Sequence, residues 1–433
     1  MLFGNEKKTN FADNMTRTNN QGSILNTHTL PNGLRIVHTS SPTRVAYCGY
    51  AIKAGTRHEL SHQQGMAHLV EHMIFKGTTH RRAWHILNRM ENVGGDLNAY
   101  TNKEEMVVYA AFMNEHLERA VELLTDIVFH STFPQHEMDK EVEVVVDEIL
   151  SYEDSPQELI YDDFEELLFP NHPLGRNILG KPEQLRTYRT ADALAFTTQH
   201  YRPENMVLFV KGDVDFRRIV RLAEKYTSDI ILPQPKAEVP SALSLPLPIY
   251  EARTVTMQKD THQAHVLMGG RAYDANDERR TALYLLNNLL GGPGMNSRLN
   301  VSLREKRGLV YTVESNLTSY TDTGAWCIYF GCDHDDVERC LELVHRELRS
   351  LCAQALTSAK LAAAQKQLIG QIGVACDNFE NRALDMAKSF LHYNRLEPAD
   401  KLFARIQSLT SSQLLDVAND MFAPERISTL IYR

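Results

Sequence analysis

Residues Tyr109–Leu124 read YAAFMNEHLERAVELL, and residues Tyr329–Val344 read YFGCDHDDVERCLELV. The two stretches lie 220 residues apart, and positions 118–119 and 338–339 are Glu-Arg in both. Each passes from an apolar segment through a polar turn into apolar residues spaced three and four apart, which predicts a strand followed by an amphipathic helix. The repeat favours a duplicated domain, although a match this short also arises by chance.

A proline-rich stretch separates the two copies. Residues 233–248 contain five prolines, which predict an extended linker because proline is excluded from helix interiors and central strands. We therefore divide the chain into a polar tail at 1–26, an N-terminal domain at 27–232, the linker at 233–249 and a C-terminal domain at 250–433. Strands and helices mix without a regular βαβ repeat, so the expected class is α+β, with two homologous domains of largely antiparallel sheet packed with helices.

Composition narrows the class of protein. A chain of 433 residues suits two domains of roughly 200 residues each. The net charge of −9 and the absence of a strong basic cluster argue against nucleic-acid binding. No apolar run approaches the ~20 residues that span a bilayer, and the N-terminus lacks the apolar segment of a secretory signal, so we expect a cytoplasmic protein. Six cysteines without a Cys-x-x-Cys pair favour reduced, mostly buried thiols.

The first half divides into alternating strand and helix patterns. Pro134 stands where a helix-starting proline belongs, and Gly94-Gly95 breaks the chain before a strand pattern. The pattern predicts strands at 26–39 with a hairpin turn near 31–33, and at 45–54, 96–101 and 106–112, with helices at 64–75, 83–92 and 134–152.

The motif His68-Leu69-Val70-Glu71-His72 lies within the first predicted helix. Residues four apart share a helix face, so His68 and His72 can bind one metal ion, with Glu71 beside it. Zinc prefers imidazole ligands, and a neighbouring carboxylate can act as general base on a metal-activated water. An alternative is that both histidines simply form the wet face opposite an apolar stripe of Met66, Leu69, Val70 and Met73.

A third ligand is available on the helix predicted at 134–152. Glu141 and Glu148 are seven residues apart and project from one side of that helix, whose other side carries Val142, Val145 and Ile149. Glu148 could complete a His-His-Glu set. By spacing alone, a surface carboxylate is the simpler interpretation of Glu148.

These segments together resemble the pitrilysin-type, or inverzincin, metallopeptidases, whose signature is H-x-x-E-H. The match is closest to the bacterial peptidases that are similar to the β subunit of mitochondrial processing peptidase. It rests on HLVEHMIFKGT at 68–78 and EVEVVVDEI at 141–149, with Glu148 placed 76 residues after His72. The resemblance implies that His68, His72 and Glu148 bind one Zn²⁺, that Glu71 is the catalytic base, and that Glu141 orients a ligand histidine.

Two further motifs carry the resemblance. GGDLNAYT at 94–101 matches a sheet edge onto which the family adds a substrate strand, which implies substrate-binding roles for Asn98 and Ala99, with Phe75 bordering the cleft. LREKRGLVY at 303–311 matches an arginine–tyrosine motif, which implies that Arg304 and Tyr311 steady the oxyanion. From the residues alone, the first is an ordinary strand and the second a basic helix end before a strand.

The resemblance implies a metalloendopeptidase that cleaves extended or unfolded peptides inside a closed chamber. It also implies a homodimer, or a heterodimer with an inactive sister subunit, and no metal site in the second half, where Asn288, Gly291 and Gly292 stand at the offset positions. The alternatives are a non-catalytic subunit of the same fold and a metal-binding protein without hydrolysis. Manganese or cobalt could replace zinc.

The role of the seven carboxylates between 153 and 166 has two interpretations. They could face the chamber and attract basic substrate residues, or form a solvated helix face, which is the simpler interpretation. They are Glu153, Asp154, Glu158, Asp162, Asp163, Glu165 and Glu166.

Overall fold

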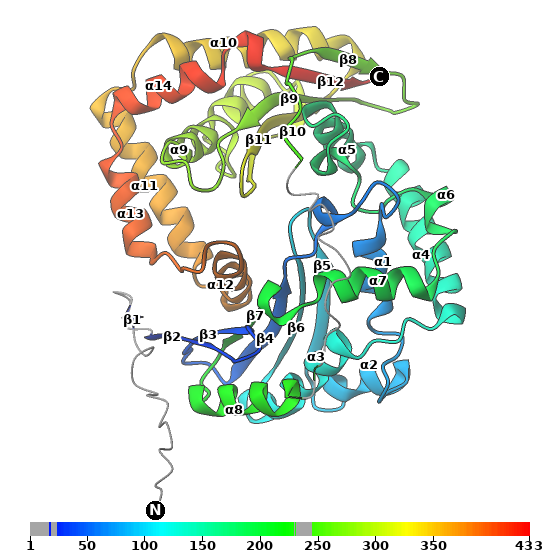
Figure 1. Cartoon of the computed structure of the whole chain (residues 1–433). Coiled ribbons are helices and arrows are strands. Elements are labelled where there is room, and N and C mark those ends of the chain that lie inside the picture. The colour runs from blue at the N-terminus through cyan, green and yellow to red at the C-terminus, as the bar shows by residue number, and fades with distance from the viewer. Residues whose placement is uncertain (1–16, 19–23, 229, 231–244) are drawn as a thin grey trace, which may run out of the picture.

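The computed structural model describes residues 17–18, 24–228, 230 and 245–433. Two halves are visible, each a twisted sheet that carries helices, with the helical hairpins of the second half reaching down to the first sheet (Figure 1). Most of the predicted tail and residues 233–244 of the predicted linker lie outside the described residues. Residues 245–249 form neither helix nor strand.

From β2 to α4 the secondary structure of the first half follows the predicted order; β1 and the elements after α4 were not predicted. Its strands are β1 Arg17–Thr18, β2 Ile24–Thr29, β3 Arg35–Thr39, β4 Val45–Ile52, β5 Asp96–Thr101, β6 Met106–Met113 and β7 Met206–Lys211. Its helices are α1 Met66–Met73, α2 Ala83–Glu91, α3 Leu117–Phe129, α4 Gln135–Glu153, α5 Pro156–Leu168, α6 Pro182–Leu185, α7 Thr190–His200 and α8 Phe216–Thr227. The β2–β3 hairpin lies where it was predicted, but β2 begins two residues before 26, inside the segment assigned to the tail.

The second half has the same kinds of element. Its strands are β8 Thr254–Met257, β9 Ala264–Ala272, β10 Val310–Ser319, β11 Gly324–Cys332 and β12 Ser428–Tyr432. Its helices are α9 Arg280–Gly291, a π-helix at Asn300–Glu305, α10 Val337–Ala353, α11 Ser358–Ala375, α12 Phe379–Tyr393, α13 Ala399–Ser408 and α14 Ser411–Met421.

The two sheets share one topology. The first runs β1-β2-β3-β7-β4-β6-β5 and the second runs β10-β11-β9-β12-β8, so β5-β6-β4-β7-β3 and β10-β11-β9-β12-β8 correspond strand by strand. Each contains a single parallel pair at the same place, β3 with β7 and β8 with β12, among antiparallel pairs. Helices α3 and α10 begin at Leu117 and Val337, at the offset of the sequence repeat. The duplicated α+β fold is therefore confirmed.

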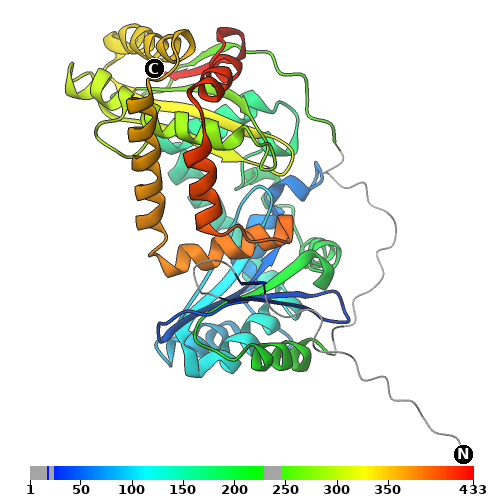
Figure 2. The same cartoon turned by 90° about the vertical axis from the view of Figure 1, so that its left-hand side faces the viewer.

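Each half donates one helix to the other half's sheet. Helix α5 packs its apolar side, including Ile160 and Phe164, against Leu267 and Tyr432 of the second sheet. Helix α12 packs reciprocally on the first sheet, against strands β4 and β7, and both views show it below the rest of the second half (Figures 1 and 2). Burial on both faces of each sheet thus depends on the other half, which ties the two halves into one unit.

The acidic residues of 153–166 divide by environment. Glu153, Asp154, Glu158 and Glu166 are exposed. Asp163 accepts a hydrogen bond from Tyr432 at 2.6 Å, and Glu165 accepts one from Tyr320 at 2.6 Å, so both contact the second half. Burial raises the pKa of Asp162 to about 6. Neither sequence interpretation of this segment anticipated that two of its carboxylates lie at the contact between the halves.

All six cysteines are free, four of them buried, as the sequence predicted. Within the described residues, no helix is long and apolar enough to cross a membrane.

Candidate metal centre

Helix α1 begins where Gly65 turns the chain. Gly65 has a φ of +82°, and a Cβ there would lie 2.7 Å from the carbonyl oxygen of Leu179, so this position requires glycine. The fully buried carboxyl group of Glu59 accepts the backbone N–H groups of Gly65 at 3.0 Å and Ala67 at 2.8 Å. These bonds satisfy amides that a helix start leaves unpaired, and they fix the turn that carries His68.

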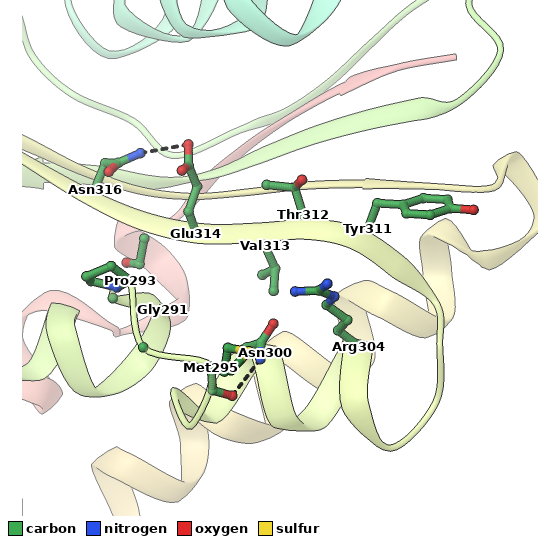
Figure 3. Close-up of a pocket in the computed structure, with 13 residues that line it drawn as sticks. Gly291, Pro293, Met295, Asn300, Arg304, Tyr311, Thr312, Val313, Glu314 and Asn316 are labelled. Carbon is green, nitrogen blue, oxygen red and sulfur yellow. Dashed lines mark hydrogen bonds between the residues drawn. The ribbon is translucent and has the colours of Figure 1, made fainter.

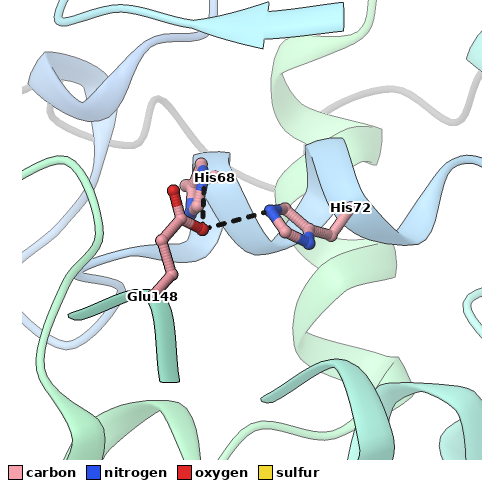
Figure 4. A group of neighbouring side chains, drawn as sticks. All are labelled: His68, His72 and Glu148. Carbon is pink, nitrogen blue, oxygen red and sulfur yellow. Dashed lines mark ion pairs between the residues drawn. The ribbon is translucent and has the colours of Figure 1, made fainter. Parts of the chain in front are cut away.

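His68, His72 and Glu148 converge between α1 and α4 (Figure 4). Oε2 of Glu148 lies 3.8 Å from Nε2 of His68 and 3.6 Å from Nε2 of His72. One ligand atom from each residue lies within 4.8 Å of the others. Two ligands bound tetrahedrally to zinc at 2.0–2.1 Å are about 3.3 Å apart, and a catalytic site takes three protein ligands and one water. The residues therefore fit a zinc ion with an open fourth position.

The solvent-face interpretation of the motif is wrong for His68, which is 7% exposed. Burial, aided by the neighbouring His72, lowers the pKa of His68 to about 3. Its imidazole is therefore neutral at pH 7, the state that binds metals. Met66, Leu69, Val70 and Met73 form a fully buried stripe, as predicted, so the helix is anchored on its apolar side while the histidines face α4.

His72 is oriented by a carboxylate on α4. Its Nδ1 lies 3.2 Å from Oε2 of Glu141, and Lys76 contacts the other oxygen of the same carboxylate. Because an ionised carboxylate only accepts hydrogen bonds, Nδ1 carries the hydrogen and Nε2 keeps its lone pair for a metal. Sequence reasoning missed Lys76, because it lies beyond the end of α1 and meets Glu141 only once α4 has packed against that helix.

Glu71 occupies the position next to the metal group. Burial raises the pKa of its carboxyl group, and the Glu148 charge adds to this shift, while Thr101 and the His72 charge oppose it. Its Oε2 is buried and has no hydrogen-bond partner among the described residues. An unused carboxylate oxygen beside a metal group is available to accept a proton from a water molecule.

Strand β5 forms one end of the first sheet and pairs with β6 on its inner side. It carries Asn98, whose side chain donates to Asp96 at 2.7 Å, and Ala99, which, like Phe75, packs against the hydrophobic core of the first half. Helix α1 contacts this strand, so the metal group and the sheet edge adjoin. An open edge adjoining the ligand helix offers main-chain groups to an extended peptide.

Arg304 and Tyr311 lie elsewhere, in a cavity of about 310 Å³ on β10 and the glycine-rich loop after α9 (Figure 3). Tyr311 is 82% exposed, and Arg304 points toward Val313 under the strand. All residues that line this cavity belong to the second half. The structure thus brings His68, Glu71, His72, Glu141 and Glu148 together but keeps Arg304 and Tyr311 out of that group.

Comparison with known proteins agrees with this arrangement. A model of "Insulinase (Peptidase family M16)" matches residues 35–182, and a model of "Peptidase M16 inactive domain" matches residues 189–368. The chain belongs to the M16 peptidase family. The metal group lies in the first matched region, and among the described residues it is the single His/Cys/Asp/Glu group suited to a metal.

Bacterial relatives align along nearly the whole chain. "Uncharacterized zinc protease YmxG" of Bacillus subtilis is 31% identical, covering 94% of this chain and 98% of its own. An uncharacterized zinc protease of Streptomyces coelicolor is 33% identical, covering 91% and 86%. The solved structure of a protease from Helicobacter pylori superposes with a TM-score of 0.86 at 23% identity, covering 94% and 99%. The pitrilysin-like resemblance is confirmed. General zinc protease activity is supported, because these relatives are named zinc proteases.

Proposed function

We propose that this M16 protein is a zinc-dependent endopeptidase with Glu71 as its general base. The observation that carries the proposal is the convergence of His68, His72 and Glu148 beside a carboxylate oxygen of Glu71 that has no partner among the described residues. A non-catalytic subunit would have no need to keep an unpartnered carboxylate oxygen buried, since an unsatisfied polar atom costs roughly 1–3 kcal/mol.

In the proposed reaction an extended peptide adds as a strand to the edge of β5, near Asn98 and Ala99, with Phe75 at the border of the cleft. A bound zinc ion would polarise the scissile carbonyl and lower the pKa of a water molecule. Glu71 takes the proton from the attacking water through its Oε2 and then delivers it to the leaving amine. Main-chain pairing at an edge strand explains how varied, unfolded sequences would be accepted.

Arg304 and Tyr311 would bind the developing oxyanion of a substrate held at the metal group of a second copy. Their cavity is lined only by the second half of the chain, which supports a homodimer in which each copy completes the other's site inside a closed chamber. A heterodimer with an inactive sister subunit would supply the same parts. Light scattering at micromolar concentration should give twice the monomer mass; a monomer that cleaves peptides at full rate would refute this assembly.

Zinc is the proposed metal, and the six free thiols suit a reducing compartment such as the cytoplasm. Basic substrate residues remain a proposed preference, to be met by the exposed carboxylates Glu153, Asp154, Glu158 and Glu166. Equal, salt-insensitive cleavage of matched basic and acidic peptides would remove that preference.

The test is cleavage of a long unstructured peptide, followed by mass spectrometry, with wild type and Glu71→Gln at equal zinc content. We expect Glu71→Gln to retain zinc and lose a factor of about 10²–10⁴ in turnover. Glu143→Gln is the matched control, because Glu143 is an exposed carboxylate paired with Arg186 at 2.9 Å. Equal cleavage by Glu71→Gln and wild type would refute the assignment. Absence of fragments from zinc-loaded wild type would favour the non-catalytic subunit.

A further inference from the structure

The two proposed histidine ligands are held differently. Nδ1 of His72 lies 3.2 Å from Oε2 of Glu141. Nδ1 of His68 is buried and has no hydrogen-bond partner among the described residues. A ligand imidazole is aimed by the hydrogen bond that its second nitrogen makes. The aim of the pair therefore depends on the hydrogen bond between His72 and Glu141.

Glu141 is itself held by Lys76. The Lys76 ammonium group contacts Oε1 of Glu141, while Oε2 serves His72, so each carboxylate oxygen has one cationic or N–H partner. The Glu141 side chain is 11% exposed and that of Lys76 is 29% exposed. Lys76 lies in the turn after α1, where its backbone N–H donates to the carbonyl of Met73 at 3.1 Å. The contact thus joins the end of the ligand helix to α4.

We infer that Lys76 is a positioning residue for the metal centre, an inference that rests on the proposed function. Lys76 holds the Glu141 carboxylate in the rotamer from which Oε2 reaches His72, and so aims Nε2 of His72 toward Glu148. A glutamate side chain gains rotational freedom when its partner is removed, and recovering one rotamer costs free energy each time a metal binds. The ammonium group acts through Glu141 and touches neither metal nor substrate.

Electrostatics alone predicts the opposite effect from positioning. Removing a positive charge near a divalent cation reduces repulsion and should strengthen zinc binding. Loss of an orienting partner behind a ligand typically weakens metal affinity 10–100-fold. The sign of the change in zinc affinity on replacing Lys76 therefore separates the two explanations.

The experiment measures the zinc dissociation constant of the full-length protein by competition with a chromophoric chelator, beside the melting temperature of the metal-free form. We expect Lys76→Met to bind zinc about tenfold more weakly, and Lys76→Arg, which restores a cation, to recover most of that loss. Lys140→Met is the matched control, since Lys140 is 67% exposed and pairs with Glu137 at 3.4 Å on the same helix α4. It should bind zinc as wild type does.

A double-variant cycle tests the route through Glu141. In a Glu141→Gln background, Lys76→Met should add no more than about twofold, because the residue through which it acts has already changed. Zinc binding by Lys76→Met within twofold of wild type, or tighter, would overturn the inference alone. Wild-type protein that binds no zinc, with His72→Ala as the reference for a lost ligand, would overturn the proposed function together with it.

Discussion

Replacing Arg57 by methionine should loosen the junction between the two halves. The Arg57 side chain is 1% exposed, and its Nη1 lies 2.7 Å from Oε1 of Glu104 and 2.7 Å from Oδ1 of Asp322. Asp322 belongs to the turn between β10 and β11, whereas Arg57 and Glu104 belong to the first half. The variant therefore removes the cation that joins a carboxylate of the first half to a carboxylate of the second half.

The expected loss in the free energy of unfolding depends on the contacts that Glu104 and Asp322 retain once Arg57 is replaced. Removing one partner of a buried ion pair typically costs about 3–5 kcal/mol, because the remaining charge is left without compensation. Asp322 is 43% exposed and can be rehydrated. Glu104 retains hydrogen bonds from the backbone N–H of Thr321 at 3.0 Å and its hydroxyl at 2.6 Å. These two facts place the expected cost at the lower end, about 3 kcal/mol.

Urea denaturation followed by tryptophan fluorescence measures this loss. The control is Arg279→Met, because Arg279 also pairs with two carboxylates, Asp277 at 2.6 Å and Asp420 at 3.3 Å, but is 58% exposed. An exposed pair is worth about 0–1 kcal/mol. If both variants lowered the free energy of unfolding equally, burial would not be what gives the Arg57 contact its strength, and the reasoning would be refuted.

Three more outcomes are expected. Burial lowers the pKa of His58 to about 3 and that of His200 to about 4. In the unfolded chain both histidines take up a proton near pH 6.5. As the pH is lowered from 6.5, the free energy of unfolding should therefore decrease by up to about 1.4 kcal/mol per pH unit for each histidine. Urea midpoints at pH 7 and 5 should therefore differ less for His200→Gln than for wild type, and an unchanged difference would contradict this. Gly65→Ala should lower the free energy of unfolding by at least about 2 kcal/mol, because Gly65 has a positive φ and lies close to the Leu179 carbonyl. Gly370→Ala, inside α11 with open space around it, should raise the free energy of unfolding by about 0.5–1 kcal/mol. Equal melting temperatures for the two variants would refute this contrast. Chelation of zinc, starting from 100 times its dissociation constant, should lower the free energy of unfolding by about 2.7 kcal/mol in wild type and leave His72→Ala unchanged, as differential scanning fluorimetry with and without chelator would show.

Local pattern was a good guide wherever the structure is governed by residues close in sequence. Strand β5 has the predicted bounds of 96–101, where the Gly94-Gly95 break decides the start. Helix α4 begins at Gln135, one residue after the predicted start, with Pro134 at its N-cap. Helix α1 is shorter than predicted, spanning 66–73 instead of 64–75, because Gly65 adopts a left-handed conformation at its start.

The metal group could be predicted from the sequence only in part. The spacing of His68 and His72 determined that they share a helix face, but spacing alone favoured a surface role for Glu148. The packing of α1 against α4 brings Glu148 within 3.6 Å of His72. Residues four apart on a helix are neighbours in any helix, whereas residues 76 apart meet only if two helices dock in one particular way.

The sequence by itself determined the duplicated α+β architecture, the order of the elements up to α4, and the pair of histidines able to share one metal. Only the tertiary structure decided that α5 packs on the second sheet and α12 on the first. The contacts of Lys76 with Glu141 and of Arg57 with Asp322 also came from the tertiary structure alone. Secondary structure follows the periodicity of apolar residues, which can be read from residues close together in the sequence. These contacts join residues far apart in the chain. Helices α5 and α12 cover a second apolar face of each sheet that its own half leaves uncovered, whereas the two ion pairs depend on how neighbouring elements pack.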